Sequence, residues 1–252
     1  MATMDRKIPI GVEIDMLPND RKVPAKVQED PLPIWFVTRI INKLHSLYLS
    51  VVFPFASFGK RVSIHYTCNI RNPRLIKLGH RVVVSQLSWL HGVLGGNQDG
   101  PTLIIDDDCM IGRSCQIAAK NSIHLERDVI VADGVLIQDH SHMYKDITRP
   151  IIDQGLTEGG RIRIGQGSWI GFGAAILCDR GELNLGRNCV VGANAVVTRS
   201  FPPYSVILGN PAVVLQQYDP IKQVWVMGTV RSTATQPTKE EHLQRDRAGL
   251  KS

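Results

Sequence analysis

Aliphatic residues recur at six-residue intervals through the middle of the chain. The longest run begins at Ile105 and ends at Val135, and shorter runs begin at Ile64, Ile164 and Leu185. The repeated positions are Ile64, Ile70, Ile76, Val82, Ile105, Ile111, Ile117, Ile123, Val129, Val135, Ile164, Ile170, Ile176, Leu185, Val191 and Val197. This interval fits neither the 3.6-residue turn of a helix nor the alternation of a simple strand. It predicts an all-β solenoid whose three-sided coils each take about 18 residues, with about five coils in total.

A different pattern precedes the repeats. Ile34, Val37, Ile41, Leu44, Tyr48 and Val51 are spaced by three and four residues, which is typical of one face of a helix. Pro33 suits the first helical turn, and Pro54 would end the helix. We expect an amphipathic helical segment at 34–58 that caps the core. Attachment to a membrane surface is the alternative, favoured by Trp35, Arg39 and Lys43.

The remaining segments complete the expected domain organisation. Residues 1–33 are polar and rich in proline and predict an extended arm, and 59–217 form the β-helix domain, followed by a polar tail at 218–252. Three segments interrupt the repeat and are expected to project as loops. They lie at 86–102, 138–161 and 178–183.

Composition narrows the class of protein. Of 252 residues, 43% are hydrophobic and 21% are charged, which permits a packed core and excludes global disorder. The net charge of +6 favours an anionic partner. Nucleic acid is disfavoured because the basic residues are scattered without an aromatic platform.

Five cysteines without a CxxC pair indicate reduced thiols. No signal-peptide core or apolar 18-residue stretch occurs, so we expect a cytoplasmic protein, with the inner face of the cytoplasmic membrane as the alternative site.

Three segments carry a family resemblance: DHSHMYKD, GGRIRIGQGSWIGFGAAI and NCVVGANAVVTRSFPPYSVILGNPA. They resemble hexapeptide-repeat acyltransferases, including galactoside, maltose, xenobiotic and polysaccharide O-acetyltransferases. The resemblance implies a left-handed parallel β-helix, homotrimers with active sites between subunits, and acetyl transfer from acetyl-CoA to a hydroxyl. SVVFPFASFGKRVSIHY is similar, more loosely, to acyltransferases of bacterial surface-polysaccharide synthesis.

Two histidines in the second interruption are candidates for the general base. An imidazole titrates near neutral pH and can take the proton of an attacking hydroxyl. The resemblance places His142 on the family's catalytic histidine and His140 two positions before it. We therefore expect His142 to be the base, with His140 as the alternative. Asp139 and Asp146 are candidates to hold the imidazole tautomer.

The donor side is expected in the last coils. Glycine and alanine let a backbone approach an extended pantetheine arm, and Gly173, Ala175 and Ala193 lie in the matching segments. By resemblance, Ala193, Thr198 and Arg199 align with positions that contact CoA. Arg199 stands where lysine is usual and is expected to bind a CoA phosphate, with a solvated surface arginine as the alternative.

Other functions stay open at this point. A sugar hydroxyl in surface-polysaccharide synthesis is the preferred acceptor, and an amino-sugar amine or an antibiotic-type small molecule is the alternative. A zinc enzyme of the γ-carbonic-anhydrase type is suggested by His140, His142 and His124, the last lying one expected coil before His142, but two histidines five apart are missing. We expect no metal. A non-catalytic scaffold is the remaining class.

Overall fold

The structure, a computed structural model, describes residues 32–96 and 100–228. The expected arm at 1–33 lies outside these residues except for its last two positions, which belong to helix α1, Leu32–Val52. The chain divides into two compact units, 1–37 and 38–252. The second unit contains residues 38–52 of α1 and all the described strands.

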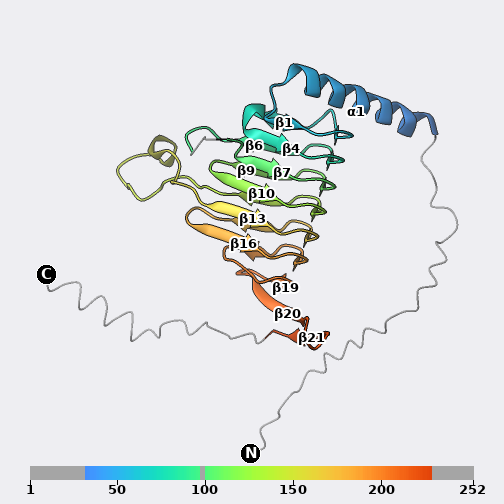
Figure 1. Ribbon diagram of the computed structural model, residues 1–252. Coiled ribbons are helices and arrows are strands. Elements are labelled where there is room, and N and C mark those ends of the chain that lie inside the picture. Colours follow the sequence, from blue (N-terminus) through green and yellow to red (C-terminus); the bar gives the residue numbers. More distant parts are fainter. Residues whose placement is uncertain (1–31, 97–99, 229–252) are drawn as a thin grey trace, which may run out of the picture. The chain divides into compact units, whose positions relative to one another are not determined.

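Three parallel sheets wind around a common core and form a β-helix (Figure 1). The first sheet consists of β1 Ser57–Phe58, β4 Ile76–Leu78, β7 Leu103–Ile105, β10 Ser122–Leu125, β13 Arg161–Ile164 and β16 Glu182–Leu185. The second begins with β2 Ser63–Ile64, β5 Val83–Val84, β8 Met110–Ile111, β11 Ile130–Val131, β14 Trp169–Ile170, β17 Val190–Val191 and β19 Ser205–Leu208. The third consists of β3 Asn69–Arg71, β6 Trp89–Gly92, β9 Gln116–Ala119, β12 Leu136–Gln138, β15 Ala175–Leu177 and β18 Val196–Val197. The first and third sheets have six strands each, so the described chain makes six coils rather than about five.

The coils are longer than the six-residue spacing predicts. Ile105 pairs with Leu125, twenty residues later, and Ile170 pairs with Val191, twenty-one residues later. The extra residues lie in the corner that leads from the third sheet to the next strand of the first, as at Lys120 and Asn121. Each side of a coil has two positions that point into the core, and they are two residues apart. When a corner gains two residues, the aliphatic residues move from the first of these positions to the second, and their six-residue spacing is kept.

The core is the predicted one. Fifteen of the sixteen repeated aliphatic residues are buried, and Ile70 is half-buried against them. Full burial of each such side chain stabilises the fold by about 1.5–3 kcal/mol. Cys109, Cys115 and Cys189 occupy further inward positions, and burial raises the pKa of the Cys109 thiol to about 12.

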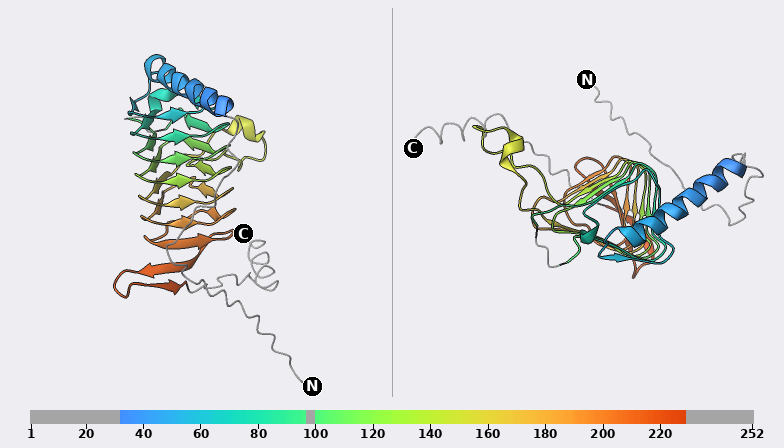
Figure 2. Two further views of the ribbon diagram at one scale, coloured as in Figure 1. Left: turned by 90° about the vertical axis from the view of Figure 1, so that its right-hand side faces the viewer. Right: turned by 90° about the horizontal axis from the view of Figure 1, so that it is seen from above.

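Only part of the expected interruptions leaves the coil. The first predicted interruption, 86–102, was too long because its residues 89–92 form β6. The third, 178–183, was also too long, because β16 begins at residue 182 and only the corner between β15 and β16 separates the two strands. The second interruption does project, from the end of β12 to the start of β13, and includes the 3₁₀ turn Ile151–Gln154 (Figure 2). The other 3₁₀ turn, Pro73–Leu75, precedes β4.

Helix α1 ends at Val52, earlier than the expected 34–58 segment, and it meets the first coil with an unexpected face. Leu49 is 3% exposed, and the Ser46 hydroxyl accepts a hydrogen bond from the Ile64 backbone N–H at 2.9 Å. The predicted apolar stripe is exposed instead, as at Leu44 and Val51. The cap itself lies across the first coil as expected (Figure 2).

The other end of the coil is closed by strands where a tail was expected. β20, Val213–Asp219, pairs antiparallel with β19, and β21, Val224–Met227, pairs antiparallel with β20. Residues 218–227 are therefore part of a hairpin, and the rest of the expected tail lies outside the described residues. Among residues 32–96 and 100–228, no helix has the length and hydropathy needed to cross a bilayer.

Candidate active site

One corner of the β-helix collects the residues predicted for the base and the phosphate contact. β12, β15 and β18 are neighbours in the third sheet, so the residues that follow each strand stack along one edge. His140 follows β12, Asp179 follows β15, and Arg199 follows β18. At about 4.8 Å between strands, the first and last of these levels are about 10 Å apart along the axis. The sheet thus joins segments about sixty residues apart in the chain.

Asp139 anchors this corner. Its carboxylate is fully buried and accepts hydrogen bonds from the backbone N–H groups of Lys120 at 2.7 Å, Asn121 at 2.7 Å and Ser122 at 2.9 Å. The same carboxylate lies 3.0 Å from Nδ1 of His140. The three backbone donors hold the long corner of the preceding coil, and the carboxylate orients the His140 ring with Nδ1 as the protonated nitrogen. Asp139 therefore positions His140 and not His142.

His142 is held by its backbone and leaves its imidazole accessible. It forms an antiparallel bridge with Leu156, flanked by hydrogen bonds from Met143 N to Gly155 O at 3.0 Å and from Thr157 N to Ser141 O at 2.8 Å. No hydrogen-bond partner for its imidazole is seen within the part of the chain that the structure describes. His140, in contrast, has a side chain only 8% exposed.

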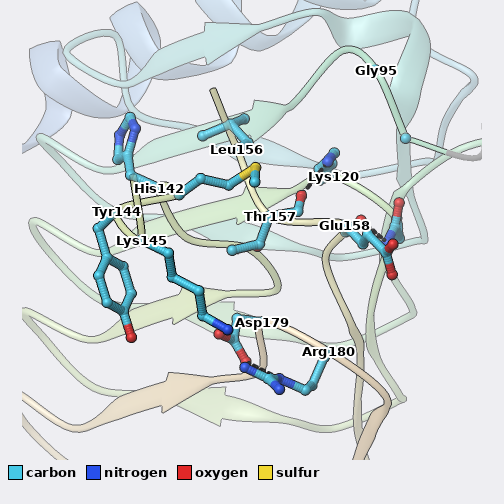
Figure 3. Close-up of a pocket in the computed structure, with 13 residues that line it drawn as sticks. Gly95, Lys120, His142, Tyr144, Lys145, Leu156, Thr157, Glu158, Asp179 and Arg180 are labelled. Carbon is cyan, nitrogen blue, oxygen red and sulfur yellow. Dashed lines mark hydrogen bonds and ion pairs between the residues drawn. The ribbon is translucent and has the colours of Figure 1, made fainter. Parts of the chain in front are cut away.

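His142 is one of the residues that line a cavity of about 730 Å³, and its imidazole lies on the side of this group away from Asp179 and Arg180 (Figure 3). The other lining residues come from four segments, namely the corners after β6, β9 and β15 and the loop after β12. They are Gly95, Gly96, Lys120, Asn121, Met143, Tyr144, Lys145, Leu156, Thr157, Glu158, Asp179 and Arg180. The size suits a small organic ligand, and apolar walls with a few polar groups are typical of such sites.

Two side chains from the preceding coil fix the loop over this cavity. The Lys120 ammonium donates to the carbonyl of Thr157, and the Asn121 amide donates to the carbonyl of Glu158 at 2.8 Å. Sequence reasoning missed both residues because they belong to another coil, and only strand register brings them to the loop. Asp146, the second candidate for orienting the base, bonds Thr148 and Arg149 within the loop.

The predicted donor residues lie on the last coils of the third sheet and its corners. Gly173 has φ +65°, and a Cβ there would lie 2.4 Å from Oδ1 of Asn194, so this turn needs glycine. Ala193 is exposed one coil further on, and Ala175 is half-buried on β15. Thr198 is exposed just after β18. Together these residues follow the sheet away from the histidines.

Arg199 is exposed, and its guanidinium makes two contacts within the chain. Its Nη2 lies 3.5 Å from the carbonyl oxygen of Ala212, and its guanidinium carbon lies 5.3 Å from the centre of the Phe201 ring. A planar guanidinium held this way keeps further N–H donors for a phosphate.

The histidine arrangement suggested for zinc is not formed. His124 lies in β10 of the first sheet, where it pairs with Ile104 and Arg163 and its Nε2 lies 2.8 Å from Asp106. The prediction that it lies one coil before His142 is wrong. The residue one coil after His124 is Arg163, and the coil that ends at β12 pairs Gln138 with Ala118, twenty residues earlier. Within the described ranges, no group of three or more His, Cys, Asp or Glu side chains is arranged to hold a metal.

Comparisons with known proteins agree with this architecture. A family model described as hexapeptide repeat of succinyl-transferase matches residues 102–138, 161–199 and 183–214. The solved structure of AntD, an N-acyltransferase from Bacillus cereus in complex with dTDP and 3-hydroxybutyryl-CoA, superposes with a TM-score of 0.54 at 17% identity. The match covers 79% of this chain and 91% of that one, and at this identity the likeness is one of fold.

Two relatives are similar in sequence. A probable acetyltransferase of Mycobacterium tuberculosis, Rv3034c, is 34% identical over 189 residues, which is 72% of this chain and 57% of that protein. A putative lipopolysaccharide biosynthesis O-acetyl transferase of Escherichia coli, WbbJ, is 30% identical over 168 residues, which is 64% of this chain and 82% of that protein. The chain thus spans little more than half of the mycobacterial protein and most of the other. With its repeats and its fold, it belongs to the hexapeptide-repeat acyltransferase family.

Proposed function

We propose that the protein transfers an acetyl group from acetyl-CoA to a sugar hydroxyl in the synthesis of a surface polysaccharide. The observation that carries this proposal is the accessible imidazole of His142, on a cavity-lining loop that leaves the third sheet at the edge where Arg199 follows β18. The name of the Escherichia coli relative supports a glycan hydroxyl as acceptor. An amino-sugar amine is the second candidate, favoured by the fold shared with an N-acyltransferase.

His142 acts as the general base in this proposal. As the acceptor oxygen bonds to the thioester carbonyl carbon, the imidazole takes the hydroxyl proton. When the carbon–sulfur bond then breaks, the resulting imidazolium returns that proton to the CoA sulfur. Nearly full burial of the His140 side chain suits a positioning role at the loop's base, where it and Asp139 stay fixed.

The donor is expected along the last two coils. Gly173 and Ala193 leave room at the corner between the second and third sheets, and the short side chain of Ala175 leaves room above the third sheet. Thr198 and Arg199 would contact the phosphate-bearing end. We also propose the left-handed sense of the coil and a homotrimer in the cytoplasm whose neighbouring subunit completes the site, as in the resemblance. A sedimentation mass of one chain at micromolar concentration would contradict the trimer.

A pair of single substitutions tests the base. His142→Ala should lose about 10²–10⁴-fold in the rate of CoA release with a sugar acceptor, which is the typical cost of removing a general base. Its affinity for acetyl-CoA should stay at the wild-type value. The matched control His140→Ala should lose less activity and more thermal stability. The reverse order would transfer the role of base to His140, and full activity in both would exclude histidine as the base.

A further inference from the structure

The part of the helix α1 surface that is not packed against the first coil carries large apolar side chains. This outer face consists of Ile40, Ile41, Leu44, Leu47, Tyr48, Val51 and Val52, each between 43% and 76% exposed. At about 100° of rotation per residue they form one continuous arc, roughly opposite Ser46 and Leu49, which contact the first coil. Soluble proteins seldom expose a contiguous apolar patch of this size without a partner surface.

Positive charge is concentrated in the same region of the chain. Between Asp30 and Asp99 there is no aspartate or glutamate, although the chain contains 23 of them. The same stretch contains eight basic residues, namely Arg39, Lys43, Lys60, Arg61, Arg71, Arg74, Lys77 and Arg81. Its formal charge therefore exceeds the +6 of the whole chain. Arg81 pairs with Asp108, whereas Lys43 and Arg61 line the groove beside the outer face. A surface that covers the outer face therefore meets these two cations, and an anionic surface complements them.

A groove beside the outer face combines both properties. It lies between α1 and the first coil, with a volume of about 600 Å³. Its apolar lining consists of Ile40, Leu44, Leu47, Phe58 and Val62. Lys43 and Arg61 also line it, and both are exposed. Acyl chains and a phosphate headgroup satisfy these two chemistries together.

We propose that the outer face docks on an anionic phospholipid bilayer, with α1 lying in the plane of the interface. A second copy of the chain fits less well, because face-to-face contact would bring Lys43 and Arg61 of both copies together, and the sequence between Asp30 and Asp99 offers no carboxylate to pair with them. The bilayer supplies apolar depth for Leu44 and Val51, and phosphate groups for Lys43 and Arg61. The proposal is independent of the acetyl-transfer chemistry.

Vesicle flotation tests the proposal. The full chain should bind phosphatidylcholine vesicles that contain 30% phosphatidylglycerol, and should bind pure phosphatidylcholine at least tenfold more weakly. The double variant Leu44→Asp, Val51→Asp should lose at least tenfold in binding to the anionic vesicles. Lys43→Gln should lose about fivefold. The matched control is Ile221→Asp, whose side chain is 92% exposed in the turn between β20 and β21, and it should bind like the wild type.

Two further readouts separate this proposal from others. The double variant should keep its melting temperature and its CoA release with a soluble acceptor, because the substituted side chains are exposed and do not line the loop cavity. Wild-type protein that stays unbound with anionic vesicles would overturn the proposal, as would equal binding by the double variant. A higher oligomer that the double variant dissociates, without vesicle binding, would assign the face to contact between copies.

Discussion

Replacing Asp139 by asparagine tests whether this buried carboxylate organises the candidate site. Its two oxygens accept four hydrogen bonds, from Lys120 N and His140 Nδ1 on Oδ1, and from Asn121 N and Ser122 N on Oδ2. An amide has one oxygen, so its NH₂ group must face donors on one side whichever way it turns. At least one buried backbone N–H then stays unpaired, and often two.

The expected loss follows from that count. Each buried donor left unsatisfied costs about 1–3 kcal/mol, so with one or two such donors Asp139→Asn should lower the free energy of unfolding by about 1–6 kcal/mol. For a chain of this size that corresponds to a fall in Tm of about 2–24 °C. Differential scanning calorimetry and urea unfolding measure both quantities. The matched control Asp153→Asn, at an exposed position in the loop, should change the stability by less than about 0.5 kcal/mol.

Activity adds a second readout for the same variant. Because the His140 ring loses its acceptor and the corner at Lys120–Ser122 loosens, the loop that carries His142 should be less well placed, and kcat should fall. Equal stability of Asp139→Asn and Asp153→Asn would refute the reasoning, because it would mean that the carboxylate accepts no hydrogen bond that asparagine cannot replace.

Two further predictions concern the donor and the core. Arg199→Ala should weaken acetyl-CoA binding by about 1–3 kcal/mol in calorimetric titration through loss of a charge-assisted phosphate bond, and unchanged affinity would place that contact elsewhere. The raised pKa of Cys109, about 12, favours the protonated thiol in the folded state, so its contribution to stability is complete below the pKa of the unfolded thiol, about 8.5, and decreases as the pH rises toward 12. Urea unfolding from pH 7 to 10.5 should show this decrease, and Cys109→Val should show a shallower one; equal slopes would contradict it.

The fold was largely predictable from the chain because its signal is local and repeated. Every coil needs inward aliphatic side chains, so Ile111, Ile170 and Val191 reveal the solenoid without any knowledge of what they contact. The histidine loop was also visible, since an interruption of the repeat has to leave the coil. Glycine at Gly173 fits the positive φ that its corner requires.

The tertiary structure decided two features: the register between successive coils, and which face of the helix packs against the core. Each side of the coil has two inward positions, two residues apart. A corner that gains two residues therefore leaves the six-residue spacing of aliphatic residues unchanged. For this reason neither the coil length nor the position of His124 could be deduced from the spacing. Lys120 reaches the loop only through strand pairing across coils. Helix periodicity likewise predicts an apolar face but not its neighbour: hydrogen bonding through Ser46 and packing of Leu49 turn the opposite face toward the core. Spacing along a chain determines which residues share a side, whereas only long-range packing determines what that side meets.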